Sequence, residues 1–305
     1  MAFQWYPGHM HKANKEMAEI LPKIDLIIEL LDARIPFSSE NPAIAKLRRN
    51  KPCIKILSKS DLADPEATLM WQAHYEQEQS VKTLATTLKQ ADKVQKIFDL
   101  CRKLVPEKAD STKDILVMIT GIPNVGKSTL INALAGKMIA KTGDEPAVTK
   151  GQQRINLGNG ITLIDTPGIL WPKIHNENSS YRLAITGAIK DTAMDYDDAA
   201  FFAADFLIKN YPDQLKQRYD IEDLPQTEIE FLELLGAKRG CLRAGGRLDL
   251  DRVSTILLNE FRAGQLGEIT LETPAMAEVE MVEVEKKMAE QEDKKQTKKK
   301  KKRRR

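Results

Sequence analysis

The sequence lacks long apolar runs and has few cysteines. In its 305 residues no stretch approaches the ~20 consecutive apolar residues that a membrane span requires. The N-terminal residues MAFQWYPGHMHK contain no apolar core of the kind found in signal peptides. The three cysteines, Cys53, Cys101 and Cys241, lie far apart without metal-ligand spacing, as is typical of reduced thiols. We therefore expect a cytoplasmic protein with no membrane segment.

The basic charge is concentrated at one end of the chain. The net charge is +3, but residues 294–305 carry ten Lys or Arg and no acid, so residues 1–293 have a net charge of −7. An acidic stretch, residues 278–293, precedes this basic run. Blocks of like charge are usually disordered, so we expect residues 276–305 to be a disordered charged tail. Ten cations favour binding to a polyanion such as RNA, with a membrane surface or a solubility role as alternatives.

A glycine-bounded loop follows the apolar run 115–119. Gly121, Gly126, Lys127 and Ser128 have the spacing Gly-x-x-x-x-Gly-Lys-Ser/Thr. In such a loop, backbone N–H groups and a helix N-terminus surround phosphates, the lysine reaches the β- and γ-phosphates, and the serine hydroxyl completes a Mg²⁺ shell. The alternative is a chance match in an unrelated loop. The predicted phosphate-binding residues are Asn124, Val125, Gly126, Lys127, Ser128 and Thr129.

A second motif predicts how the base is read. Asp61 follows the apolar strand 53–57, and its carboxylate can accept both N1–H and N2–H of guanine, a donor pair that adenine lacks. The stem of Lys59 would lie over the base. A backbone N–H after the next strand, 81–84, could meet guanine O6. On its own, a Lys-x-Asp motif is usually just part of a surface loop. The predicted base-binding residues are Ser58, Lys59, Ser60, Asp61, Thr86 and Thr87.

A third group of residues has the pattern of a nucleotide switch. Thr149 would close on Mg²⁺ only when a γ-phosphate is present, Asp165 would hold a metal-bound water, and the Gly168 N–H would touch the γ-phosphate. Ile169 stands where several GTPases place a water-orienting Gln, and an isoleucine cannot polarise water.

The order of the motifs is unusual. In an ordinary guanine-nucleotide domain the phosphate loop precedes the base-reading loop, whereas here Asp61 precedes Gly121 by sixty positions. The polar stretch 106–114 would join the original termini, because surface connections tolerate circular permutation. The sequence therefore indicates a permuted domain.

Six segments together resemble the circularly permuted GTPases of the YlqF/YawG family. They are WYPGHM at 5–10, DARIP at 32–36, SKSD at 58–61, GIPNVGKST at 121–129, DTPGILWP at 165–172 and TGAIKD at 186–191. The resemblance covers residues 1 to about 275. It implies an α/β P-loop GTPase domain with a mostly parallel sheet and helices on both faces, followed by a small all-α domain. It also implies a cytoplasmic enzyme that hydrolyses GTP to GDP and phosphate and acts in assembly of the large ribosomal subunit.

The resemblance extends to individual residues. It places an N-terminal histidine near the switch, so His9 is the candidate that orients the attacking water, with a capping or packing role as the alternative. Asn124 resembles the asparagine of GTPases that bind K⁺, although an ordinary turn asparagine fits equally. Ser58 stands where the family usually has asparagine, and its hydroxyl is expected to be too short to bridge the base and the phosphate loop.

The rest of the chain predicts a partner-binding region. We expect a GTPase domain at 1–173 and a helical domain at 174–275, because apolar residues there recur at helical spacing. The resemblance implies that the partner is a precursor of the large ribosomal subunit with its rRNA, and we expect a protein that is monomeric off the ribosome. The predicted RNA-contacting cations are Lys238, Arg239, Arg243 and Arg247, with a solvated surface as the competing interpretation.

Two other functions fit the same motifs. One is a non-catalytic scaffold whose affinity for RNA depends on the bound guanine nucleotide. The other is a GTPase that serves RNA modification, but residues 173–275 supply no recognisable catalytic site for it.

Overall fold

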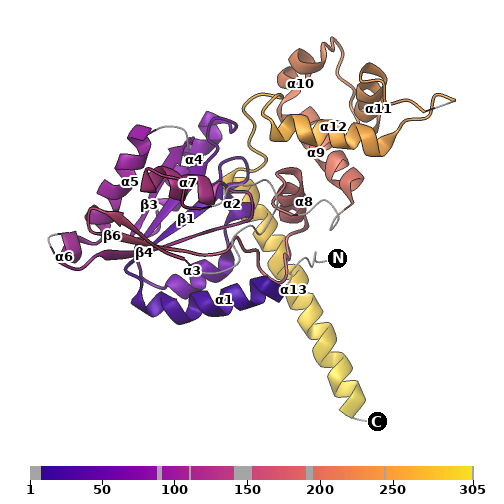
Figure 1. Cartoon of the computed structure of the whole chain (residues 1–305). Helices are drawn as coiled ribbons and strands as arrows, with labels where there is room; N and C mark the ends of the chain where they lie inside the picture. Colours follow the sequence, from indigo (N-terminus) through magenta and orange to yellow (C-terminus); the bar gives the residue numbers. More distant parts are fainter. Residues whose placement is uncertain are drawn as a thin grey trace.

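A central sheet organises the first part of the protein (Figure 1). The computed structural model describes residues 8–87, 91–109, 111–140, 153–189, 195–243 and 245–303, with the backbone alone at some positions, among them His9 and residues 291–303. In these residues the sheet has six strands in the order β3-β2-β1-β4-β6-β5. The strands are β1 (Leu26–Asp32), β2 (Cys53–Ser58), β3 (Val81–Thr86), β4 (Ile115–Gly121), β5 (Gln153–Gly158) and β6 (Ile161–Asp165).

Helices cover both faces of this sheet. Helices α1 and α3 lie on one face, and α5 and α7 lie on the other (Figure 1). Strand β1 is buried along its whole length because it is central and covered on both sides. The helices of this domain are α1 (Gly8–Ile20), the 3-10 turn η1 (Leu21–Lys23), α2 (Pro36–Ser39), α3 (Pro42–Arg48), α4 (Pro65–Tyr75), α5 (Ala91–Leu104), α6 (Pro106–Ala109) and α7 (Lys127–Ala135).

The sheet brings the predicted motifs to one edge. Strands β1, β2, β3, β4 and β6 are parallel, and only β5 pairs antiparallel, with β6. Asp32 at the end of β1 pairs with Ser58 at the end of β2, and Leu30 of β1 pairs with Gly121 at the end of β4. The base-reading loop and the phosphate loop therefore leave the same edge of the sheet. This confirms the predicted permuted α/β fold.

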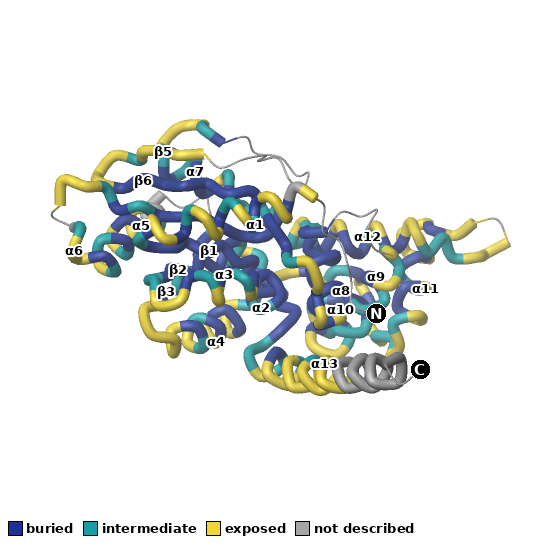
Figure 2. Tube along the Cα trace, turned by 90° about the horizontal axis from the view of Figure 1, so that it is seen from below, coloured by how far each residue is buried: buried dark blue, intermediate teal, exposed yellow. Residues whose placement is uncertain are grey.

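A group of helices follows the sheet, as predicted. Helix α9 contacts α8, α11 and α12, and these helices share a buried interior (Figure 2). Helix α8 also contacts α2, so it links this group to the GTPase-like domain. The helices are α8 (Glu177–Ile185), α9 (Tyr196–Asn210), α10 (Pro212–Tyr219), α11 (Glu228–Lys238) and α12 (Leu250–Arg262).

The predicted domain boundary at residue 275 is displaced. After α12 the chain returns to the first domain along residues 264–272, which we call the return segment. The Ile269 N–H donates to the Leu62 carbonyl at 3.0 Å, and the Leu271 N–H donates to the Arg34 carbonyl at 2.8 Å. The indole N–H of Trp71 donates to the Glu272 carbonyl at 2.9 Å. The return segment thus packs on the sheet domain, a contact between distant parts of the chain that local apolar spacing could not reveal.

The prediction that residues 276–305 are disordered is wrong for the start of this region. Helix α13 (Pro274–Arg303) begins directly after the return segment and extends away from the domains (Figure 1). Glu280 on this helix accepts hydrogen bonds from the buried Arg182 of α8 at 2.7 and 2.8 Å, and Ala277 is buried. The acidic residue therefore has a specific cationic partner. Across the described residues no helix combines the length and the apolar character needed to cross a bilayer.

Candidate nucleotide site

The phosphate loop leads into a helix with an open N-terminus. Gly126 is the N-cap of α7 in a left-handed conformation, with φ 99° and no side-chain cap. Asp64 and Asn176, in contrast, cap α4 and α8 with their side chains. The first N–H groups of α7 are therefore available to an anion. Gly121 at the start of the loop must be small, since a Cβ there would lie 2.8 Å from the Leu30 carbonyl oxygen.

Lys127 and Asp165 form a buried ion pair beneath this loop. Their side chains are 6% and 1% exposed, and the lysine ammonium donates to Asp165 Oδ1. Burial raises the pKa of Asp165, and the nearby ammonium only partly offsets this effect. The other oxygen, Oδ2, has no hydrogen-bond partner among the described residues. The two predicted ligands of phosphate and metal thus meet, at the ends of α7 and β6.

These groups fit a Mg²⁺ ion. Mg²⁺ takes oxygen ligands and keeps several waters, so one or two protein ligands suffice beside the phosphates. Asp165 offers a buried carboxylate with an unpartnered oxygen, and Ser128 is half-buried in the first turn of α7. Thr149, the third predicted ligand, lies outside the described residues.

The end of β2 touches the phosphate loop through Ser58. Its hydroxyl lies 2.7 Å from the Val125 carbonyl oxygen and 2.9 Å from the Leu31 carbonyl oxygen. The hydroxyl therefore reaches the phosphate loop, and the expectation that it cannot also bridge to the base stays a prediction. The sheet brings the two loops close enough for a short side chain. Ser58 is fully buried, so its side chain connects the two loops inside the protein and is not exposed to solvent.

The base-reading turn exposes Asp61. Lys59 has a left-handed backbone, with φ 54°, and its ammonium donates to Asp32 Oδ2 at 2.9 Å. Asp61 is exposed and Ser60 is half-buried. On the neighbouring strand the buried Thr86 hydroxyl donates to the Thr87 carbonyl at 2.9 Å. These positions place the predicted base-reading side chains at the edge of the sheet that also carries the phosphate loop.

Asp32 and Arg34 are a part of this site that the sequence did not reveal. Arg34 donates to Asp32 through Nε at 2.9 Å and Nη2 at 2.7 Å, and both side chains are 2% exposed. Burial alone would raise the pKa of Asp32, but Arg34 and Lys59 hold that pKa well below its usual range. The motif DARIP is visible in the sequence, but only the fold shows that its acid orients the lysine of the base-reading turn.

The segment that follows β6 packs tightly on the phosphate loop. A Cβ at Gly168 would lie 3.2 Å from Pro123 Cα, and the Ile169 N–H donates to the Gly121 carbonyl at 3.2 Å. Ile169 is 1% exposed, so its side chain belongs to the core. The Gly168 backbone is therefore near the phosphate loop, where a γ-phosphate contact is predicted.

Asn124 and His9 remain predictions. The Asn124 backbone is left-handed, with φ 59°, and its Nδ2 donates to the Gly187 carbonyl at 2.8 Å, which links the phosphate loop to the end of α8. The His9 backbone lies in the first turn of α1, and its side chain lies outside what the structure describes.

The predicted RNA-contacting cations are exposed but mostly have partners within the helical domain. Lys238 donates to the Asp220 carbonyl at 2.6 Å, Arg239 pairs with Glu260 at 2.7 Å, and Arg243 pairs with Asp249 at 2.8 Å. Arg247 is exposed on the hairpin between α11 and α12. These contacts support local structure as well as a positive surface.

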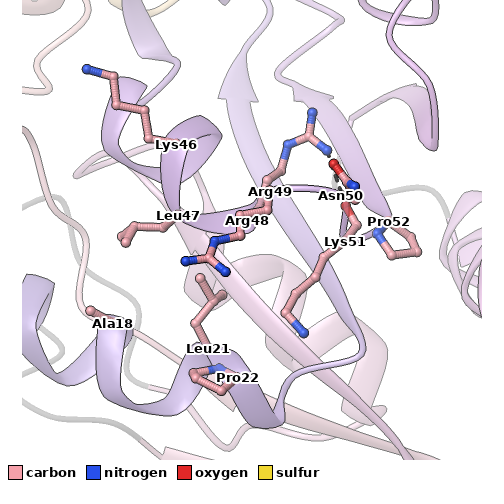
Figure 3. Close-up of a pocket in the computed structure, with 10 residues that line it drawn as sticks. All are labelled: Ala18, Leu21, Pro22, Lys46, Leu47, Arg48, Arg49, Asn50, Lys51 and Pro52. Atoms are coloured by element: carbon pink, nitrogen blue, oxygen red, sulfur yellow. Dashed lines mark hydrogen bonds between the residues drawn. The ribbon is translucent and has the colours of Figure 1, made fainter.

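A second basic surface lies at the opposite edge of the sheet. A hollow of about 720 Å³ is lined by ten residues of α1, η1, α3 and the loop between α3 and β2, four of them cations and none of them acidic (Figure 3). The side chains of Arg48 and Lys51 donate hydrogen bonds to backbone carbonyls, whereas Lys46 and Arg49 are exposed at the rim. The lining residues are Ala18, Leu21, Pro22, Lys46, Leu47, Arg48, Arg49, Asn50, Lys51 and Pro52. We call this surface the basic hollow.

Comparison with known proteins decides the family. A family model described as "50S ribosome-binding GTPase" matches residues 116–233. Ribosome biogenesis GTPase A of Bacillus pumilus is 46% identical over 281 residues, which cover 90% of this chain and 99% of that protein. The chain belongs to the ribosome biogenesis GTPase A family. A Thermotoga maritima member is 32% identical over 270 residues, covering 88% of this chain and 94% of that protein.

Solved structures agree with this membership. The GDP-bound structure of Thermotoga maritima YlqF matches with a TM-score of 0.61 and 27% identity, over 85% of this chain and 99% of that one. The GNP-bound YlqF of the same organism matches equally well, with a TM-score of 0.61. As a member of this family, the protein is a GTP hydrolase that acts in ribosome assembly, and it binds guanine nucleotides.

Proposed function

We propose that GTP hydrolysis gates the association of this GTPase with a precursor of the large ribosomal subunit. The observation that carries the proposal is the bond from Asn124 in the phosphate loop to the Gly187 carbonyl at 2.8 Å. Gly187 in turn lies against Arg262 of α12, because a Cβ on this glycine would be 3.4 Å from Arg262 Nε. A change at the phosphates therefore has a short path into the helical domain. The description of the matching family model as 50S-binding supports the large subunit as partner.

The site residues divide the chemistry among themselves. Lys127 and the open N-terminus of α7 stabilise negative charge on the phosphates. Ser128, Asp165 and Thr149 would hold Mg²⁺, which supplies further positive charge when bound. Asp61 selects guanine, and Gly168 contacts the γ-phosphate through its N–H. His9 orients the attacking water, because Ile169 cannot. Asn124 would hold a K⁺ ion, which would supply the positive charge that an arginine finger supplies in other GTPases.

In this proposal the protein is a monomer in the cytoplasm, and it contacts the rRNA of its partner. The cations Lys238, Arg239, Arg243 and Arg247 form one contact surface, and the basic hollow forms a second, since Lys46 and Arg49 project at its rim without an acidic neighbour among the lining residues. Phosphate contacts of this kind give affinity that falls steeply with salt.

Binding and turnover measurements test the proposal. Affinity for purified large-subunit precursors should differ between GDP and a non-hydrolysable GTP analogue, and the particle should raise GTP turnover. Turnover that stays negligible with every ribosomal particle would support the scaffold instead. A GTPase that serves RNA modification would require a modified RNA product. A precursor that binds equally in both nucleotide states would overturn the gating proposal.

Asn124→Ala tests the path and the cation together. At saturating nucleotide it should reduce the difference in precursor affinity between the two nucleotide states. It should also abolish the loss of turnover expected when Na⁺ replaces K⁺. Asn159→Ala is the matched control, because Asn159 is also left-handed, with φ 54°, but lies in the turn between β5 and β6.

A further inference from the structure

The turn that carries Asp61 is fixed on two sides by residues outside it. The Leu62 N–H donates to the Lys59 carbonyl at 3.0 Å and closes the turn. On one side, Asp32 accepts the Lys59 ammonium at 2.9 Å. On the other side, the Leu62 carbonyl accepts the N–H of Ile269 in the return segment at 3.0 Å. Because Asp61 lies between Lys59 and Leu62, both contacts determine where its carboxylate lies.

Arg34 connects these two sides. Its guanidinium donates twice to Asp32, and its carbonyl accepts the Leu271 N–H of the return segment at 2.8 Å. The guanidinium also lies 5.3 Å from the ring centroid of Phe261 in α12, a cation–π distance. Arg34 Nη1 is buried without a partner among the described residues. Such a group is costly to bury, so its place depends on the carboxylate and the ring that hold the rest of the side chain.

Gly264 brings the end of α12 against the same turn. Its φ is +72°, and a Cβ there would lie 2.5 Å from Leu62 Cδ2. The backbone conformation favours glycine here, and a Cβ would displace the end of the Leu62 side chain. Two further bonds support the contact, from the Asp64 N–H to the Thr270 hydroxyl at 3.1 Å and from the Tyr211 hydroxyl to the Thr270 carbonyl at 3.0 Å.

We infer that the return segment and Arg34 are positioning elements for guanine recognition and couple the base-reading turn to the helical domain. This path acts on the base, so it operates with GDP and GTP alike and is separate from the γ-phosphate switch. By linkage, a partner that displaces the helical domain changes guanine affinity, and guanine binding changes partner affinity by the same factor. Only the identity of that partner as a ribosomal particle rests on the proposed function.

Comparing GDP with inosine diphosphate isolates the contact to Asp61. Inosine lacks the 2-amino group, so Asp61 keeps one of its two hydrogen bonds to the base. Gly264→Ala displaces the end of the Leu62 side chain and strains the backbone beside the turn, and Arg34→Lys removes the bidentate pair and the guanidinium that lies over Phe261. Each should lower the ratio of GDP affinity to inosine diphosphate affinity about two- to tenfold, the value of one hydrogen bond. Titration calorimetry of the full-length protein measures both affinities.

Gly158→Ala is the matched control. Gly158 is also left-handed, with φ +74°, but it lies at the end of β5, outside the return segment, and a Cβ there would meet no described atom within 4 Å. This variant should retain the wild-type affinity ratio, and thermal unfolding shows whether all three variants fold. An unchanged ratio in both Gly264→Ala and Arg34→Lys, or an equal fall in Gly158→Ala, would overturn the inference.

A second measurement adds the ribosomal particle. Large subunits should shift the affinity ratio of the wild-type protein but not that of Gly264→Ala. Failure of the subunits to bind at all would overturn the proposed function, whereas the ratio measured on the isolated protein would still decide whether the return segment positions the turn.

Discussion

At the scale of single residues, the buried Glu29 should make the free energy of unfolding depend on pH. It lies in β1, is 2% exposed, and burial raises its pKa to about 7 although Lys55 opposes this. The folded state therefore keeps a proton that the unfolded chain releases above its ordinary pKa of 4.5. Stability should fall as the pH rises from about 4.5 to 7, by on the order of 3 kcal/mol, and level off above that. Denaturant unfolding measured across this pH range tests the prediction.

Glu29→Gln should remove most of this slope, because an amide does not titrate. The exposed Glu19→Gln serves as control and should keep the wild-type slope. If Glu29→Gln unfolds with the wild-type pH dependence, another group is responsible.

Substitution of His9 should affect GTP hydrolysis but not nucleotide binding. Its imidazole is the candidate that orients water, so His9→Ala should lower GTP turnover about 10- to 100-fold while GDP and GTP affinities stay unchanged. Single-turnover hydrolysis and nucleotide titration measure the two properties. The neighbouring His11→Ala controls for general effects on α1. Wild-type turnover in His9→Ala would remove this residue from the mechanism.

At the scale of elements, the junction of β4 and the phosphate loop depends on a missing side chain. Gly121→Ala would place a Cβ 2.8 Å from the Leu30 carbonyl oxygen and 2.9 Å from Val125 Cγ1, so the loop must shift. Nucleotide affinity should fall at least tenfold, since the loop N–H groups no longer converge on the phosphates. Gly136→Ala at the end of α7 meets nothing within 4 Å. Although its φ of +64° makes the change mildly destabilising, it should leave affinity unaltered.

Among these elements, the phosphate loop could be predicted from the sequence, whereas contacts between distant elements could not. The phosphate loop was predictable because Gly126, Lys127 and Ser128 act through local backbone geometry between an apolar strand and a helix. The contact of Ser58 with the phosphate loop could not be predicted, because it depends on the distance between two strands, which no local pattern contains. The start of α13 was misjudged for a similar reason. Its acidic residue Glu280 resembles solvated charge until Arg182, about a hundred positions earlier, is seen beside it.

Asp32 and Arg34 show a different limit. Their motif was visible, and the residues are adjacent to a strand end, but nothing in the sequence says which groups they pair with. The parallel pairing of β1 with β2 brings Asp32 to Lys59, and the packing of α12 near the end of β1 brings Phe261 to Arg34.

At the scale of the whole molecule, the ten cations of residues 294–305 predict how the protein depends on salt. Removing them should weaken binding to large-subunit RNA and flatten the dependence of log affinity on log salt, by about 0.9 for each phosphate that the tail neutralises. GTP turnover without ribosomes should not change, because the site lies in the sheet domain. Filter binding over a range of about 50 to 200 mM salt measures the slope.

The control for this deletion is a tail of the same length in which serine and glutamine replace the cations. It should behave like the deletion if charge is responsible. A wild-type slope in either variant would assign the RNA contact to the basic hollow or to the helical domain.

The position of the return segment late in the chain has a consequence for biosynthesis. Domains emerge from the ribosome N-terminal part first. The base-reading turn and the phosphate loop are both translated well before residues 264–272, so a nascent polypeptide holds every nucleotide motif while the outer support of the Asp61 turn is still missing. On this inference, the preference for guanine is completed only at the end of synthesis, and a product truncated before residue 264 should show a lower ratio of GDP affinity to inosine diphosphate affinity.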